Sequence, residues 1–350
     1  MQNSWYDKIK LLRNFKILLN VVSEPTYYPE KERKNYFRRF YENLLWGLKH
    51  RTINKEYNFY GMDIKGSREN YLDKKTADKT REKLNKVRDN KSEYNHVVLL
   101  RDKYVFFSYL KSLNIPTPNC LALSIHGKMI YLDDLANEED LFRNGKIFAK
   151  ILEGERALGV KCISSLAELK ELQKAWKKEN YILQEKIKQH EEMNRICSYC
   201  VNTLRIITVY YNGSAHFLSA SLRCGSEKSG FVDNFNCGGY AIGIKEDGFL
   251  GQYAYVKANY ESKKIEVHPD SGLKFADFKI PFYKEAIQMI CDLHRHFYGV
   301  VCIGWDVAIT SEGPVVIEGN DNCGFVTQLK FNENFSEKWL DLCRIYNVKR

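Results

Sequence analysis

Residues 304–320, near the C-terminal end of the chain, hold two apolar runs that are separated by the turn at 311–313. Their alternation and the glycine in the turn predict a β-hairpin, which fixes two neighbouring strands. Because strand side chains alternate between faces, Glu318 and Asn320 would share a face, with Asp306 on the neighbouring strand. Carboxylate and amide oxygens suit Mg²⁺, although a hairpin with polar ends and no ligand gives the same pattern.

Composition indicates an ordinary globular protein. At 350 residues, with 44% hydrophobic and 28% charged residues, the chain can bury a sizeable core and form two or three subdomains. The ten cysteines show no framework spacing, which favours a reducing compartment over disulfides. The CxxC at residues 197–200 has no second pair, so it is weak support for metal or redox chemistry. Without a leader or an apolar run of about 18 residues, we expect a cytoplasmic protein.

Charge is concentrated at one end of the chain. The first 100 residues carry 22 Lys and Arg against 13 Asp and Glu, so they account for nearly all of the net charge of +10. Apolar residues at helical spacing predict amphipathic helices within residues 1–95. We expect a helical cap on the following domain, with a docking element for substrate or an anionic membrane surface as the alternative. No nucleic-acid motif accompanies the charge, so we expect no nucleic-acid partner.

The middle of the chain, residues 96–190, alternates helices and strands. A helix begins near Lys103 and is ended by two prolines, and a later strand carries Lys150. That strand is followed by a loop with Gly154 and Gly159, which can lie over phosphates but lacks the ending of a P-loop. The same periodicities predict strands at 119–123, 146–152 and 181–187, and a helix at 166–178 capped by Ser165.

A series of short motifs follows in a fixed order along the chain. They are Lys103 with residues 115–118, residues 148–150, Gln184–Glu185 with His190, residues 202–208, residues 232–235 with Gly238–Gly239, residues 268–272, and the hairpin. This combination resembles the ATP-grasp fold, and within it most closely the sugar-transfer-associated branch. The resemblance covers roughly residues 96–330. It implies an α+β fold in which two subdomains clamp ATP between antiparallel sheets, after a helical N-terminal region.

The resemblance also implies domain limits and a nucleotide site. Residues 1–95 would be the basic helical region, residues 96–190 the first ATP-grasp subdomain, and residues 191–350 the second, with the metal site. Lys103 and Lys150 would approach the phosphates and adenine. The adenine hinge would contain Gln184, Glu185 and Ile187, and the ribose would meet Glu191 or Glu192, of which we take Glu192. The loop at 154–159 would be the flap, although Glu155–Leu158 replace its usual small residues.

Catalytic roles follow from the same resemblance. Arg205 and Arg223 would orient a carboxylate and the transferred phosphoryl group, with structural ion pairing as the alternative. Asn234 would approach the γ-phosphate or the acceptor. Asp306, Glu318 and Asn320 would hold one or two Mg²⁺ ions, with Mn²⁺ as a substitute, and Asp306 and Glu318 would also contact the nucleotide. His268 would either face the substrate or cap a loop, and we expect Cys224 and Cys237 to take no part.

We therefore expect an ATP-dependent carboxylate–amine ligase that works through an acyl phosphate, in surface polysaccharide (capsule) synthesis or glycan modification. Its substrates would be a carboxylate and an amine, either small or linked to a glycan. An ATP-dependent phosphotransferase on a carbohydrate or hydroxyl acceptor is one alternative. A non-catalytic nucleotide-binding component of glycan assembly is another. Peripheral contact with an anionic membrane surface or with glycan-synthesis enzymes fits the basic N-terminal region.

Overall fold

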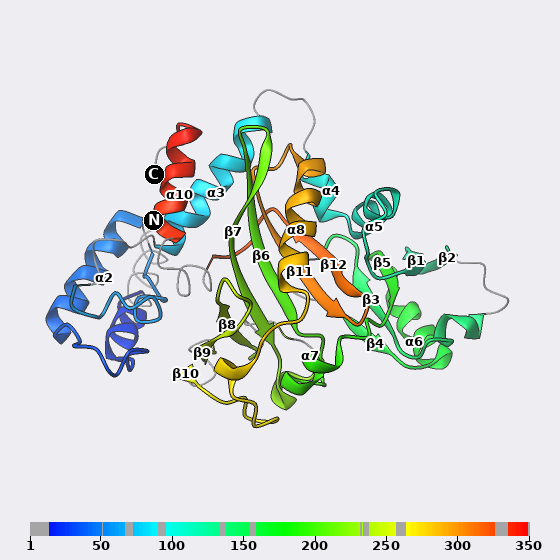
Figure 1. Cartoon of the computed structure of the whole chain (residues 1–350), viewed down its shortest axis with the longest axis horizontal. Helices are drawn as coiled ribbons and strands as arrows, with labels where there is room; N and C mark the ends of the chain where they lie inside the picture. The colour runs from blue at the N-terminus through cyan, green and yellow to red at the C-terminus, as the bar shows by residue number, and fades with distance from the viewer. Residues whose placement is uncertain are drawn as a thin grey trace, which may run out of the picture.

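The chain folds around two separate β-sheets with helices packed on them (Figure 1). The computed structural model describes residues 14–50, 52–66, 73–89, 96–132, 138–154, 159–231, 233, 238–256, 264–325 and 335–348. Every strand pair within these ranges is antiparallel, as expected for the α+β class. No helix in this part of the chain is long and apolar enough to cross a membrane.

The smaller sheet belongs to the middle of the chain. Its five strands run in the order β2-β1-β5-β3-β4. Their bounds are β1 (Cys120–Ile125), β2 (Lys128–Tyr131), β3 (Ile147–Ile151), β4 (Lys161–Ile163) and β5 (Tyr181–Glu185). Helix α6 (Leu166–Ala175) and the short helix η1 (Glu138–Phe142) pack on it around the buried Trp176. Ser165 caps α6 by accepting a hydrogen bond from the backbone N–H of Glu168 at 3.3 Å, as predicted.

The larger sheet has seven strands in the order β10-β9-β8-β7-β6-β11-β12. Long, nearly continuous apolar runs form its central strands, because both faces of the sheet are covered. The bounds are β6 (Thr203–Tyr211), β7 (Ser214–Cys224), β8 (Tyr240–Ile244), β9 (Leu250–Tyr255), β10 (Lys264–Ile265), β11 (Cys302–Thr310) and β12 (Gly313–Asn320). The short helices η2 (Glu227–Ser229) and η5 (Phe275–Asp277) lie in its connections.

Different helices cover the two faces of the large sheet. On one face, α8 (Tyr283–His294), followed by η6 (Arg295–Phe297), packs in the cluster that contains Ile206 and Trp305. On the other face, α3 (Lys74–Asp89) and α10 (Phe335–Ile345) pack in the cluster that contains Ile207. Arg205 and Asp306 are the chain neighbours of Ile206 and Trp305, which point towards α8. Because side chains alternate along a strand, Arg205 and Asp306 point to the opposite face, the α3 side of the sheet.

The N-terminal region is docked on the rest of the chain through side-chain packing. Residues 14–23 form a helix, followed by α2 (Tyr36–His50) and later by α3. Tyr27 and Phe59 pack with Ala241 and Tyr255 of the large sheet. This packing agrees with the expected helical cap. The interpretation of residues 67–93 as an exposed helix or connector is wrong for residues 74–89, because α3 buries Leu84 against the sheet.

The predicted hairpin is formed by β11 and β12, with Asp306 directly opposite Glu318. A bulge after Asp306 shifts the register, so that the next pair is Val307 with Val316. Helix α4 (Val98–Arg101) contacts β12, and α5 (Lys103–Ser112) follows it and packs on α4. The backbone N–H of Val316 donates to the carbonyl of Pro116 at 2.8 Å, which ties the hairpin to the middle of the chain.

Helix α8 is joined to the sheet by a buried chain of hydrogen bonds. The indole N–H of Trp305 donates to the Thr208 hydroxyl at 2.7 Å, and that hydroxyl lies 2.7 Å from Nδ1 of His294. Nε2 of His294 lies 2.9 Å from the Val300 carbonyl, which can only accept. Nε2 of His294 therefore carries a proton, and when the imidazole is neutral the Thr208 hydroxyl donates to Nδ1.

This arrangement predicts acid sensitivity of the fold. Burial lowers the pKa of His294 from 6.5 to about 4, so the unfolded chain takes up the proton first as pH falls. Stability contributed by neutral His294 is complete above about pH 6.5 and declines towards pH 4, by about 3 kcal/mol in total. Urea unfolding at pH 4 to 7 measures the decline, which His294→Gln should reduce. A matching change at the half-buried His216 should leave the decline intact. Equal pH profiles for wild type and His294→Gln would contradict the prediction.

Candidate active site

A large cavity opens between the two sheets, on the α3 side of the large sheet. Its volume is about 1500 Å³, and its wall contains residues from all three regions of the chain. The small sheet contributes Lys150 and Gln184, and the large sheet contributes Arg205 and Asp306. The cavity therefore brings together most of the positions that the sequence predicted. Those that line it are Lys103, Lys150, Gln184, Glu185, Ile187, Arg205, Arg223, Asp306, Glu318 and Asn320.

Asp306 is buried between two arginines of neighbouring strands. Arg205 donates to both of its carboxylate oxygens, from Nε at 2.6 Å and from Nη2 at 3.1 Å, and Arg223 donates from Nη2. Burial alone would raise the pKa of Asp306, but the two guanidinium groups hold it well below its usual range. The carboxylate is therefore ionised at any physiological pH.

Arg223 retains a donor that the protein does not use. Among the described residues, its Nε is buried and has no hydrogen-bond partner. A buried donor of a charged group that lacks a partner costs free energy. Arg223 itself lines the cavity, and an oxygen of a carboxylate or phosphoryl group would fit its guanidinium best, since guanidinium groups bind both by paired hydrogen bonds. Arg223 thus combines an ion pair to Asp306 with a position on the cavity wall.

Glu318 and Asn320 lie beside Asp306 on the next strand. Glu318 faces Asp306 across the hairpin, and Asn320 donates from Nδ2 to Oε1 of Glu318 at 3.2 Å. Burial and the neighbouring Asp306 carboxylate both raise the pKa of Glu318. Two carboxylates and an amide oxygen at the edge of a cavity are hard ligands, and a divalent cation between them would relieve the repulsion. The three residues therefore fit a Mg²⁺ ion.

This site would not enclose a metal with protein ligands alone. Within the described part of the chain, no group of three or more His, Cys, Asp or Glu side chains could hold an ion by itself. Mg²⁺ commonly takes one or two carboxylates and completes its coordination with phosphate oxygens and water.

The CxxC thiols, Cys197 and Cys200, lie 3.8 Å apart as free cysteines.

Two lysines face the acidic wall from the other side. Lys150 is at the end of β3, where burial lowers its pKa, Glu318 opposes that effect and Lys103 adds to it. Lys103 starts α5, and its Nζ donates to the carbonyl of Gly154 at 2.6 Å, at the start of the glycine loop. Both lysines line the cavity. Two ammonium groups opposite two carboxylates are suited to the phosphates of a nucleotide.

The predicted adenine hinge forms the end of β5 and the segment after it. Gln184 is buried and donates to the carbonyl of Pro118 at 3.4 Å, whereas Glu185 accepts from Asn144 at 2.9 Å. Ile187 lines the cavity between them and the second subdomain. The N–H of His190 donates to the carbonyl of Ile309 at 2.7 Å, so the hinge is attached to the hairpin.

Two predicted positions lie elsewhere, and a third is outside the described residues. Glu192 is on α7 (Glu191–Ile196), pairs with Arg195 and lines a separate small hollow, so its geometry does not support the ribose role. His268 is fully buried, with Nε2 2.8 Å from the carbonyl of Gly225, which agrees with a loop cap and not with a substrate contact. Asn234 lies outside the described residues, as do residues 155–158 and Cys237.

Sequence reasoning gave no role to several residues of the cavity wall. Asp233, within the motif at 232–235, is half-buried beside Arg223 and accepts from the N–H of Thr203 at 3.1 Å, and desolvation raises its pKa. The N-terminal region contributes the largest missed group: Glu24, Tyr27, Lys55, Glu56, Phe59, Lys74, Asp78 and Arg81. The spacing of polar residues on one face of α3 was the available signal that this helix lines a cavity. A charged helix more often faces solvent, however, so the spacing alone did not indicate it.

The fold and the cavity together define the class of protein. Two antiparallel sheets enclose a site with lysines on one side and paired carboxylates on the other, as in the ATP-grasp fold. The chain belongs to the sugar-transfer associated ATP-grasp family, which it matches over residues 87–339. The expected fold and family are thereby confirmed. A search of curated proteins found no match.

Solved structures with a similar arrangement include several ligases. D-alanyl-alanine synthetase A from Vibrio cholerae O1 biovar eltor is 15% identical, with a TM-score of 0.46, over 72% of this chain and 66% of that one. D-alanine–D-alanine ligase from Bacillus anthracis is 15% identical, with a TM-score of 0.43, over 72% and 67%. L-amino acid ligase from Bacillus licheniformis is 13% identical, with a TM-score of 0.44, over 71% and 48%. The chain thus spans about two thirds or less of their lengths.

Asp306 should contribute to stability as well as to binding. Asp306→Asn leaves Arg205 and Arg223 buried without their anion, and breaking a buried pair costs about 3–5 kcal/mol. Asp292→Asn is the control, since its partner Arg295 and Asp292 itself are both about half exposed. That exposed pair should contribute less than about 1 kcal/mol. Urea unfolding without nucleotide measures both losses, and losses of equal size would show that the two arginines do not depend on Asp306.

Proposed function

We propose that this chain is an ATP-dependent carboxylate–amine ligase that forms an acyl phosphate. The observation that carries the proposal is the meeting of Lys103 and Lys150 with Asp306 and Glu318 around one cavity, beside a buried arginine donor without a partner. Membership of the sugar-transfer associated ATP-grasp family supports the use of ATP. A phosphoryl group and a carboxylate are both anions, and this site holds cationic donors for each.

Each residue has a role in this proposal. Lys103 and Lys150 donate to the phosphates, while Gln184, Glu185 and Ile187 hold the adenine through the hinge. Mg²⁺ bound by Asp306, Glu318 and Asn320 would neutralise charge that develops on the β- and γ-phosphate oxygens. Mn²⁺ can replace it because it takes the same ligands.

The arginines would position the groups that react. Arg223 donates to the substrate carboxylate or the transferred phosphoryl group, and Arg205 keeps Asp306 ionised and in place. A carboxylate oxygen attacks the γ-phosphorus, and the bond to the β-phosphate oxygen breaks to release ADP. The amine nitrogen then attacks the acyl carbon. The carbon–oxygen bond to phosphate breaks, phosphate leaves, and the nitrogen loses a proton.

The cellular setting is a further part of the proposal. The family's association with sugar transfer supports a substrate from surface polysaccharide synthesis, with the carboxylate or the amine carried by a small molecule or a glycan. The nine described cysteines are free thiols, which supports a reducing compartment such as the cytoplasm.

Measurement of ADP release tests the ligase proposal. Wild type with Mg²⁺ and ATP is screened against sugar acids and amino acids combined with a panel of amines, and products are identified by mass spectrometry. Glu318→Gln should reduce ADP release at least 100-fold, because a metal ligand is lost at the reacting phosphate. Glu312→Gln, at the exposed turn of the same hairpin, should leave the rate unchanged.

The same screen separates the alternatives. A phosphorylated carbohydrate or hydroxyl product without amide would identify a phosphotransferase. Nucleotide binding without any ADP release, together with full biological function of an Asp306→Ala/Glu318→Ala variant, would identify a non-catalytic component. Unchanged activity of that double variant would exclude the ligase mechanism.

We also propose peripheral contact with an anionic membrane surface through α2. Phe37 is 81% exposed and Leu48 is 70% exposed, and Tyr41 and Leu45 complete the same helical stripe. The region is basic, which suits anionic lipid. Phe37→Ser/Leu48→Ser should weaken sedimentation with phosphatidylserine vesicles several-fold. Ile345→Ser, at another exposed apolar residue, should not. Equal binding by all three proteins, or equal binding to neutral vesicles, would contradict the contact.

A further inference from the structure

The active-site cavity is larger than one nucleotide requires. Its volume of about 1500 Å³ exceeds the roughly 300–1,000 Å³ that is typical of a pocket for one small ligand. The nucleotide and metal positions occupy the part between the small sheet and the hairpin. The remaining wall comes from the N-terminal region, including Lys55, Glu56, Lys74 and Asp78. This wall has no role in the nucleotide site described above.

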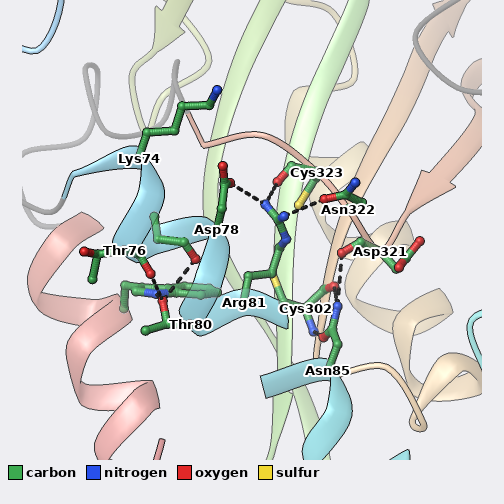
Figure 2. Close-up of polar contacts among 12 residues, drawn as sticks. Lys74, Thr76, Asp78, Thr80, Arg81, Asn85, Cys302, Asp321, Asn322 and Cys323 are labelled. Carbon is green, nitrogen blue, oxygen red and sulfur yellow. Dashed lines mark hydrogen bonds and ion pairs between the residues drawn. The ribbon is translucent and has the colours of Figure 1, made fainter. Parts of the chain in front are cut away.

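Helix α3 is attached directly to the strand that carries the metal ligands (Figure 2). Arg81, which is 5% exposed, donates to Oδ1 of Asn322 at 2.5 Å and to the carbonyl of Cys323. One turn further along, Asn85 donates to the carbonyl of Asp321 at 3.1 Å. Because these acceptors directly follow the end of β12 at Asn320, buried hydrogen bonds fix α3 relative to the metal site.

Asn85 makes the same connection to the other strand of the hairpin. Its Oδ1 accepts from the N–H of Cys302 at 2.8 Å, and its Nδ2 donates to the carbonyl of Cys302 at 3.2 Å (Figure 2). Helix α3 therefore touches β11 at its start and the chain just after β12. Charged groups near the beginning of α3 are thus held at a set position along the cavity, and they are not parts of a loosely attached cap.

Lys74 and Asp78 lie one helical turn apart on α3, on the same stripe as Arg81 and Asn85 (Figure 2). Nζ of Lys74 is 3.6 Å from Oε1 of Glu56, and Oδ1 of Asp78 accepts from Arg81 at 2.9 Å. The side chains of Lys74 and Asp78 are 39% and 36% exposed. The pair of Lys74 with Glu56 is exposed on both sides and therefore weak, so a ligand can compete for Lys74. Asp78 holds the buried Arg81 through Oδ1, but its carboxylate is exposed enough to meet a ligand as well. The pair of Arg205 with Asp306 is much less exposed, so a ligand cannot easily displace either partner.

We propose that Lys74 and Asp78, with Lys55 and Glu56 beside them, bind the amine substrate, and that this substrate is amino-acid-like. The proposal rests on the ligase function. Asp78 would pair with the ammonium group of the incoming substrate and Lys74 with its carboxylate. Fixed charges of both signs suit a zwitterion, whereas an uncharged sugar would need neutral hydrogen-bonding groups. The N-terminal region would thereby determine what is joined, and the ATP-grasp subdomains how it is joined.

Direct binding tests this assignment without requiring turnover. The full chain, saturated with Mg²⁺ and the non-hydrolysable analogue AMP-PNP, is titrated calorimetrically with the twenty L-amino acids and D-alanine. The tightest binder is then compared with its N-acetyl derivative, which lacks the ammonium group, and with its amide, which lacks the carboxylate. Wild type should bind the free amino acid at least 10-fold more tightly than either derivative.

Variants assign the two charges to the two residues. Lys74→Gln should lose the preference over the amide, and Asp78→Asn should lose the preference over the N-acetyl derivative. Each should weaken amino-acid binding at least 10-fold and change AMP-PNP affinity less than 2-fold. Lys79→Gln and Glu82→Gln, at exposed positions of the same helix, should change neither affinity. Asp78→Asn keeps an acceptor for Arg81, and equal melting temperatures would verify that the variants fold.

Each contrary outcome has a separate meaning. Normal AMP-PNP binding with no amino-acid binding would overturn the assignment of this subsite and leave the ATP function standing. Amino-acid binding that Lys74→Gln and Asp78→Asn leave unchanged would also overturn it. Absence of AMP-PNP binding in wild type would overturn the proposed function and the subsite with it. Equal weakening of both ligands in the variants would place these residues in the nucleotide site instead.

Discussion

The buried carboxylate of Asp306 is the constraint on which the site depends. A charge this far from solvent is tolerated only with paired donors, and two arginines from the neighbouring strands supply them. Those donors exist only if β6 and β7 lie beside β11 in the observed register, where Arg205 is paired directly with Asp306. The same strand order and register that build the centre of the sheet therefore also place the charged groups of the cavity.

The same constraint explains why the two faces of the large sheet differ. Trp305 and Ile206 point to the face that α8 covers, so their neighbours Asp306 and Arg205 must point to the other face. That face is covered at one end by α3 and α10 and faces the small sheet at the other. The polar cavity occupies the space between these two covers. Alternation along a strand thus separates an apolar core from a polar site only one residue apart.

Local patterns in the sequence predicted much of this arrangement. The hairpin, the Ser165 cap and the helix of α5 depend on residues close in the chain, and all three were predicted correctly. The family resemblance placed Lys103, Lys150 and both arginines, which meet at the cavity. Neither Glu191 nor Glu192 lines the cavity, because both lie in the first turn of α7, where Glu192 pairs with Arg195.

The contribution of α3 could not be predicted in this way. Arg81 finds its partners 241 and 242 positions away along the chain, and no local pattern encodes so distant a contact. Alone, a helix rich in lysine and glutamate indicates only a solvated surface. Arg81 and Asn85 also precede residue 87, where the match to the family begins. Since these two residues bond to the start of β11 and to the chain just after β12, a part of α3 that precedes the matched region is built into the cavity wall. Under the proposed assignment, substitutions in this part of α3 would change the preferred amine substrate. They would leave Asp306 undisturbed, because its contacts are with Arg205 and Arg223 and not with α3.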